Sequence, residues 1–261
     1  MSTQAASSQI APGVVERYHA DGYLVIRDVF GADEIAALAG EAVTLLERTE
    51  LIDTANLRCR WADHVETGEC MFDCFDPVID IGPISRYVAR DERIMTPLRA
   101  IYGHDAFLFK DKLIFKRPGA KGYALHQDYI SWPEFPTSFI TVIVAIDPTD
   151  RSNGATEVFP GCHKAGMLSE RDGDYHELPT TAVGEVRSVS LDLRPGDIAL
   201  FDGMMPHASA PNRSDRWRRQ LYLSYNAASD GGDLREAHYR QFHDWLRKKY
   251  AEFGRGPVYF H

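Results

Sequence analysis

Three residues of this chain could together hold one metal ion. His126 and Asp128 stand two positions apart in GYALHQDYISW, Gly122 to Trp132, a stretch with the character of a strand. Side chains two apart on a strand point to the same face, so an imidazole nitrogen and a carboxylate oxygen can converge on one ion. His207, far downstream in DGMMPHASAPN, is the best candidate for a third ligand. Two histidines and one carboxylate are typical of non-haem Fe(II) oxygenases, in which open metal positions remain for a co-substrate and O₂.

Two polar residues that follow His207 could bind an organic acid. Arg218 stands at the start of a predicted strand that includes RQLYLSY. An arginine there can make the bidentate contact that the distal carboxylate of a dicarboxylic acid requires. Ser209 can add a hydroxyl to the same carboxylate.

The composition is that of one acidic globular domain. The chain has 261 residues, 44% of them hydrophobic, and a formal net charge of −9. This length fits a single domain over residues 1–261. The negative charge argues against nucleic acid as a partner, because phosphate backbones are bound mainly by lysine and arginine. We therefore expect a small-molecule substrate.

The sequence also predicts a cytoplasmic protein. The opening MSTQAASSQIAPG lacks the basic and apolar regions of a leader, and no apolar run approaches the roughly 20 residues that span a bilayer. Four cysteines in a chain of this length are not a disulfide framework, and a cytosolic setting would keep them reduced. We expect no membrane partner, and the oligomeric state is left open.

Helices followed by strands would position the candidate residues. We expect residues 1–105 to form a largely helical cover with a lid loop, 106–228 a β core and 229–261 a C-terminal helix. From residue 106 onward, at least six short apolar or alternating runs are separated by turn residues. This order predicts a mainly β fold with flanking helices and a double-stranded β-helix core of the jelly-roll or cupin type.

Hydrophobic periodicity predicts the elements before and after this core. Helices are expected over about 14–21, 33–46, 86–102 and 237–253, and a strand over 23–30. Residues 50–85 mix aromatic, charged, glycine and proline residues without a sustained period. That segment could be a lid or a substrate wall, or a surface excursion packed by its own aromatic residues.

The sequence resembles the phytanoyl-CoA dioxygenase-like family of Fe(II)- and 2-oxoglutarate-dependent oxygenases. Four stretches carry the resemblance, and they occur in the order typical of the family. They are YHADGYLVIRDVF, the HQD of residues 126–128, SNGATEVFPGCHK and HASAPNRSDRWRRQLYLSY. Together they cover most of the chain from about residue 18 to 226.

The resemblance implies a cofactor, a co-substrate and residues that bind them. By it, His126, Asp128 and His207 are the ligands of Fe(II). Arg218 and Ser209 would hold the C5 carboxylate of 2-oxoglutarate, whose keto acid end chelates the metal. Lys112 falls at a position that contacts the co-substrate, although Lys110 or Lys116 could be the inward lysine of the same strand.

The resemblance also implies the reaction. The expected outcome is hydroxylation of a C–H bond with release of succinate and CO₂, because the carboxylate position is a small residue in related halogenating enzymes and is Asp128 here. The sequence favours a compact polar metabolite or natural-product intermediate as the substrate. A non-catalytic cupin-like small-molecule or metal-binding protein or sensor is the alternative.

Four further residues are candidates for contact with the substrate. Tyr129 and Trp132 follow the HQD strand and could wall the pocket, although packing in the core is nearly as plausible. Arg58 and Trp61, from the expected lid loop, could bind a polar or anionic substrate, although exposed arginines are usually only solvated.

Overall fold

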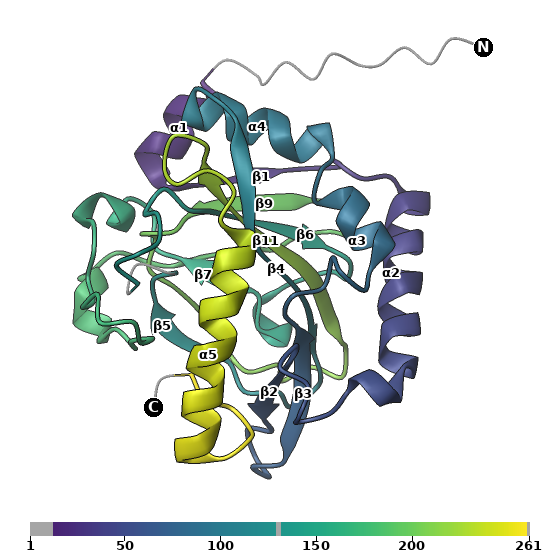
Figure 1. Cartoon of the computed structure of the whole chain (residues 1–261). Helices are drawn as coiled ribbons and strands as arrows, with labels where there is room; N and C mark the ends of the chain where they lie inside the picture. The colour runs from purple at the N-terminus through teal and green to yellow at the C-terminus, as the bar shows by residue number, and fades with distance from the viewer. Residues whose placement is uncertain (1–12, 129–131, 260–261) are drawn as a thin grey trace.

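The computed structural model describes residues 13–128 and 132–259, and in it two antiparallel sheets face each other as a jelly roll (Figure 1). The larger sheet has seven strands in the order β1 (Tyr23–Ile26), β9 (Ile198–Asp202), β6 (Ile140–Ala145), β11 (Arg218–Ala227), β4 (Ala106–Lys116), β3 (Cys70–Phe75) and β2 (Cys59–Asp63). The smaller sheet has four strands in the order β5 (Tyr123–His126), β10 (His207–Ser209), β7 (Thr156–Val158) and β8 (Val189–Ser190). The predicted fold class is confirmed.

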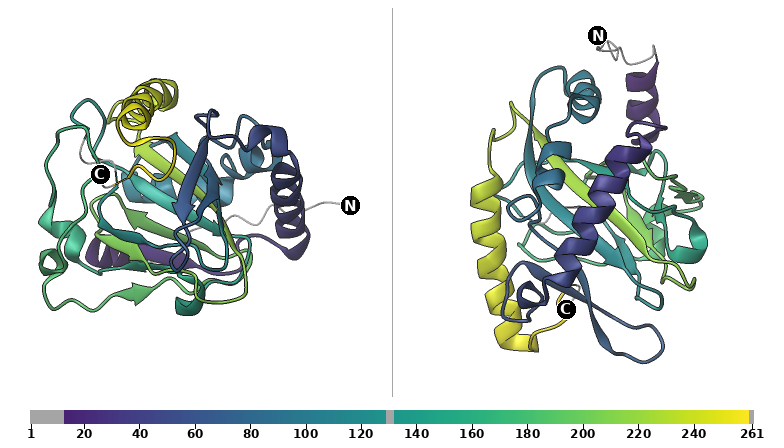
Figure 2. Two further views of the ribbon diagram at one scale, coloured as in Figure 1. Left: turned by 90° about the horizontal axis from the view of Figure 1, so that it is seen from below. Right: turned by 90° about the vertical axis from the view of Figure 1, so that its right-hand side faces the viewer.

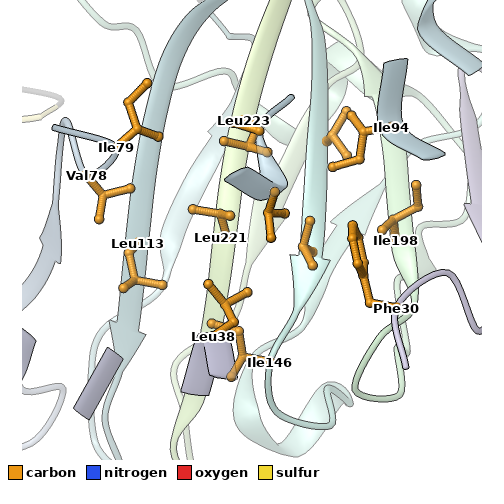
Figure 3. Packing of buried hydrophobic residues seen from close by; sticks show 14 of the residues in the cluster. Phe30, Leu38, Val78, Ile79, Ile94, Leu113, Ile146, Ile198, Leu221 and Leu223 are labelled. Carbon is orange, nitrogen blue, oxygen red and sulfur yellow. The ribbon is translucent and has the colours of Figure 1, made fainter. Parts of the chain in front are cut away.

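Helices cover the outer face of the seven-stranded sheet. They are α2 (Ala32–Glu47), α3 (Pro83–Val88) and α4 (Glu92–Tyr102), and Figure 2 shows them together on one side of the molecule. Leu38 and Ile94 from these helices pack on Leu113, Leu221 and Leu223 of the central strands (Figure 3). Burying each such side chain stabilises the fold by about 1.5–3 kcal/mol. Helices from the first 105 residues thus lie on one side of the large sheet, while β1, β2 and β3 from the same part of the chain belong to the sheet itself.

Alternation along β4 and β11 directs a different set of side chains to the inner face. Successive strand residues point to opposite faces, and the register from Lys116 opposite Arg218 to Lys110 opposite Ser224 is unbroken. The even-numbered residues of β4 from 110 to 116 therefore share the inner face. Those residues are Lys110, Lys112, Ile114 and Lys116.

The segment 50–85 differs from the expected lid loop. Its β2 and β3 form a hairpin that pairs with β4 and extends the large sheet. Packing between side chains of the two strands stabilises this hairpin. The Trp61 ring packs edge-to-face against Phe72, with 5.9 Å between the ring centroids. The helix predicted over 86–102 is two helices, because Asp91 caps α4 by accepting a hydrogen bond from the Arg93 backbone at 2.9 Å.

The remaining helices agree with the predicted periodicity. Helix α1 (Val14–Asp21) ends at Gly22, which takes a φ of 78° that suits a C-terminal glycine. Helix α5 (Arg235–Phe253) places Phe242 and Leu246 against Phe109 of β4. Short 3-10 helices lie in the connections at Thr49–Leu51, Arg151–Asn153, Cys162–Ala165 and Thr180–Val183. Within the described part of the chain, no helix has the length and apolar character needed to cross a membrane.

Candidate active site

The structure brings the three predicted metal ligands together between the two sheets. His126 at the end of β5 pairs in register with His207 at the start of β10, and Asp128 follows two residues after His126. Asp128 Oδ1 lies 3.8 Å from Nε2 of each histidine. One ligand atom from each residue falls within 4.8 Å of the others. The spacing within one strand explains the first two residues, and the pairing of β5 with β10 supplies the third.

Hydrogen bonds orient all three side chains. Nδ1 of His126 lies 2.7 Å from the Ala124 carbonyl oxygen, and Nδ1 of His207 lies 2.9 Å from that of Met205. A carbonyl can only accept, so each Nδ1 carries the proton and each Nε2 offers a lone pair. Oδ2 of Asp128 accepts a hydrogen bond from Thr141 Oγ1 at 3.0 Å. Oδ1 therefore remains available to a metal ion between the two histidines.

The electrostatics also suit a bound cation. Burial, together with the neighbouring His207, lowers the pKa of His126 to about 3. Burial alone would raise the pKa of Asp128, but His207 and His126 outweigh it and the pKa is lowered. At neutral pH the site therefore presents a neutral His126 imidazole and an ionised carboxylate, the forms that coordinate metals.

Two buried cations lie side by side near the other end of the site. Arg218 on β11 stands opposite Lys116 on β4, and only 1% of each residue's surface is exposed. Lys116 Nζ donates to Ser209 Oγ at 2.9 Å, and Arg218 Nη1 donates to the Gly154 carbonyl oxygen. Burial, and then Arg218, lowers the pKa of Lys116 well below its usual value.

The cation pair is open to a carboxylate ligand. Among the described residues, no carboxylate lies within the 4.0 Å of an ion pair with Arg218 or Lys116, and Arg218 Nε is buried without a hydrogen-bond partner. The backbone at Ala210 can lie close to residue 154 because that residue is glycine. A Cβ at Gly154 would lie 2.2 Å from the Ala210 carbonyl oxygen. A bound carboxylate would satisfy both cations through charge-assisted hydrogen bonds.

One cavity joins the metal ligands to the cation pair. It is lined by residues of both sheets, including Lys110, Lys112 and Ile114 of β4. Lys116, not Lys112, is the lysine that reaches Ser209 and Arg218. Lys112 lies close enough to the metal ligands to lower the pKa of both His126 and Asp128, although its effect on each is smaller than that of His207. Of the lysines considered for contact with the co-substrate, Lys112 therefore lies near the metal ligands and Lys116 near Arg218.

The predicted substrate residues lie in other places. Tyr129 is outside the described residues. Trp132 is buried in an aromatic cluster with Phe242 of α5, which is the packing alternative. Arg58 donates to the Pro77 carbonyl at 2.6 Å and does not line the cavity. Trp61 lines a neighbouring hollow. The prediction for Arg58 does not agree with this geometry, because residues 50–85 form an edge hairpin rather than a lid.

Several lining residues were not predicted from the sequence. They are Cys74, Tyr123, Thr156, Tyr175, Tyr222 and Tyr259. Tyr222 follows Arg218 by four positions on one strand, so alternation alone places both on the inner face. Tyr175 and Tyr259 lie outside regular elements, and no pattern in the sequence points to them.

Comparisons with known proteins agree with this geometry. The family model for phytanoyl-CoA dioxygenase matches residues 18–220. A methylphosphonate hydroxylase of Gimesia maris is 38% identical over 54% of this chain, and the match spans 52%, about half, of that relative's length. A 2-aminoethylphosphonate dioxygenase of an uncultured bacterium is 30% identical over 70% of this chain and 71% of its own.

A solved structure shares the fold. The crystal structure of EctD from S. alaskensis with 2-oxoglutarate and 5-hydroxyectoine superposes with a TM-score of 0.71 at 21% identity, covering 88% of this chain and 80% of that one. The family match covers the strands that carry His126, Asp128 and His207, together with Arg218. The chain belongs to the phytanoyl-CoA dioxygenase family.

Proposed function

We propose that this protein is an Fe(II)- and 2-oxoglutarate-dependent dioxygenase that hydroxylates a C–H bond of a small molecule and releases succinate and CO₂. The observation that carries the proposal is one cavity holding two separate sets of groups. His126, Asp128 and His207 converge at one point of it. Arg218 lines another part of it, beside Lys116, and both are buried with no carboxylate at ion-pairing distance among the described residues.

The donor set fits ferrous iron. Two imidazoles and one carboxylate bind Fe(II) while leaving coordination positions open. When bound, iron and 2-oxoglutarate supply the oxidising chemistry, and the protein supplies binding and orientation. The hydrogen bonds from the two Nδ1 atoms and from Thr141 hold the donors in place before any ligand arrives.

The cation pair fits the second carboxylate of 2-oxoglutarate. Arg218, Lys116 and Ser209 would hold that carboxylate, and its buried setting strengthens each charge-assisted hydrogen bond. This contact would leave the keto acid end of the molecule free to reach the metal ligands. A non-catalytic binding protein has no need to keep both sets, which favours the enzyme over that alternative.

The substrate we favour is compact and carries an oxyanion. Two relatives are named for methylphosphonate and 2-aminoethylphosphonate, which makes small organophosphonates the first candidates. We place the enzyme in the cytoplasm, where the cysteines Cys59, Cys70, Cys74 and Cys162, all free, stay reduced.

Succinate formation tests the proposal. Purified protein with Fe(II), 2-oxoglutarate and O₂ is expected to release some succinate without its substrate and more with it, and mass spectrometry should detect the gain of one oxygen. The matched controls are Asp128→Ala, which removes a metal donor, and the exposed-lysine variant Lys164→Met. Absence of both succinate and donor-dependent Fe(II) binding in the wild type would overturn the proposal.

A further inference from the structure

We infer that Lys112 and Tyr175 form the binding site for an oxyanion of the primary substrate, so that the substrate is a compact anion of the phosphonate or carboxylate class. This inference rests on the proposed function and adds to it the residues that recognise the substrate. It assigns Lys112 to the substrate rather than to the co-substrate.

The three lysines on the inner face of β4 have different surroundings. Lys110 Nζ lies 3.1 Å from Asp76 Oδ2, in an ion pair. Lys116 Nζ contacts Ser209 beside Arg218. Lys112 Nζ lies over the Tyr222 ring, 5.2 Å from its centroid, and within the described chain it has no carboxylate at ion-pairing distance. Lys112 is therefore the lysine of this face that is neither in an ion pair nor beside Arg218, so its charge is available to a second ligand.

Tyr175 supplies an unused donor in the same cavity. Its hydroxyl is buried and has no hydrogen-bond partner among residues 13–128 and 132–259. Leaving such a group unsatisfied costs about 1–3 kcal/mol, so a ligand that accepts its hydrogen bond gains that amount. Burial, followed by Asp76, raises the pKa of Tyr175 far above its usual value, so the phenol keeps its proton and can only donate to an anion.

The C-terminal helix holds Tyr175 in position. The Tyr175 ring packs edge-to-face against Trp245 at 5.3 Å and against Tyr259 at 5.0 Å. Its neighbour Asp174 accepts hydrogen bonds from Trp245 Nε1 and Lys249 Nζ, each at 2.8 Å. Helix α5 and Tyr259 lie beyond residues 18–220, the part that the family model matches. The wall that positions Tyr175 thus belongs to a part of the chain outside the shared family region.

Charge balance also favours an anionic substrate. Five cationic side chains lie in or next to the cavity, against three carboxylates. The cations are Arg60, Lys110, Lys112, Lys116 and Arg218, and the carboxylates are Asp73, Asp76 and Asp128. Fe(II) and the 2-oxoglutarate dianion cancel each other. The filled site therefore keeps positive charge even when Lys116 is neutral, and buried charge without a partner is unfavourable.

Lys112 and the Arg218–Lys116 pair serve different anions. Lys112 and Lys116 are four residues apart on one strand, a separation of about 13 Å between their Cα atoms. In the proposed function, Arg218, Lys116 and Ser209 would hold the carboxylate end of the co-substrate. The oxyanion held by Lys112 would then belong to the second ligand.

The test compares a charged ligand with a neutral one of similar shape. Calorimetry under anaerobic conditions, with Fe(II) and 2-oxoglutarate present, measures binding of methylphosphonate, 2-aminoethylphosphonate and the neutral methanesulfonamide. Wild type is expected to prefer a phosphonate. Lys112→Met should weaken phosphonate binding roughly 10- to 100-fold, from loss of an ion pair, and Tyr175→Phe roughly 5- to 10-fold, from loss of a hydrogen bond whose donor is uncharged.

Two further variants make the result specific. Lys112→Arg keeps the charge and should retain most of the preference for phosphonate. Lys164→Met removes an exposed lysine and serves as the matched control for loss of charge. Methanesulfonamide binding should change little in Lys112→Met, because it carries no charge to lose.

Two outcomes would overturn the inference. One is that Lys112→Met weakens 2-oxoglutarate at least as strongly as phosphonate, which would assign the lysine to the co-substrate. The other is that neither phosphonate binds wild type better than methanesulfonamide. In both cases succinate formation by the wild type would still support the proposed function, so the two failures can be told apart.

Discussion

The β4–β11 strand pair has two buried faces with opposite energetics. On the face toward α2 and α4, side chains such as Leu113 and Leu221 are fully buried in the apolar core. On the other face, the basic side chains of Lys116 and Arg218 are just as buried, and no carboxylate of the described chain lies within ion-pairing distance of either. Burying a leucine contributes about 1.5–3 kcal/mol, whereas an unpaired buried charge costs several kcal/mol.

This difference shows how one pair of strands can serve both stability and binding. The helix-covered face offsets the unfavourable charges of the cavity face, and a bound anion would remove the penalty that remains. Variants on the two faces should therefore separate stability from ligand affinity. Five changes test that separation, from the largest expected effect to the smallest.

Asp128→Ala should abolish metal-dependent activity. The change removes one of three donors from the point where they converge, which should weaken Fe(II) far more than the 10- to 100-fold typical of an outer partner. Metal titration and succinate release measure the effect. Unchanged Fe(II) affinity would remove Asp128 from the metal site.

Arg218→Met should weaken 2-oxoglutarate binding by about 2–5 kcal/mol, because the carboxylate loses its buried partner. The free protein should not lose stability in proportion, since the variant also removes an unpaired buried charge. Calorimetry with 2-oxoglutarate and urea unfolding of the free protein measure the two effects. Arg218→Lys should restore only part of the affinity, because it lacks the bidentate fork.

Leu221→Ala should show the opposite behaviour on the other face of the same strand. Leu221 is fully buried against the helices, so its truncation should lower the free energy of unfolding by about 2–4 kcal/mol. The dissociation constant of 2-oxoglutarate should stay close to that of wild type. If both Leu221→Ala and Arg218→Met change stability and affinity alike, the contrast between the faces fails.

Lys116→Met should change how stability depends on pH. The pKa of Lys116 is lowered in the folded protein, by burial first and then by Arg218, so the unfolded chain binds the proton more tightly. The free energy of unfolding should therefore rise with pH toward the ordinary lysine pKa of about 10.4, by at most about 1.4 kcal/mol per pH unit.

Urea unfolding of the ligand-free protein between about pH 8 and pH 9.5 measures this slope. In Lys116→Met the contribution is absent, so wild type should gain stability relative to the variant as pH rises. Parallel profiles for the two proteins would mean that Lys116 keeps an ordinary pKa.

Thr141→Val should have the smallest effect on the metal site. It removes the hydrogen bond from Oγ1 to Asp128 at 3.0 Å but leaves all three donors in place. Fe(II) affinity should fall by roughly 10-fold, the lower end for an outer partner. A loss as large as that of Asp128→Ala would indicate that Thr141 does more than orient the carboxylate.

Much of the architecture could be predicted from the sequence because it depends on local periodicity. Helices α1, α2 and α5 and the strands of the core follow apolar repeats of 3.6 or two residues. The hairpin of β2 and β3 could not be predicted in this way. The hairpin is stabilised by the pairing of β3 with β4, and the residues of β2 and β3 show no pattern from which that pairing could be predicted.

The sequence by itself determined that His126 and Asp128 share one face, because that follows from their spacing along one strand, and the order of short motifs singled out His207 and Arg218 as candidates. Only the tertiary structure decided which groups each lysine of β4 contacts. All of the even-numbered lysines face inward, and their roles diverge because Asp76, Ser209 and Tyr222 approach them from other segments. Tyr175 is held at the cavity by contacts with α5. Those contacts join residues some 70 positions apart, so the local sequence around Tyr175 does not predict them.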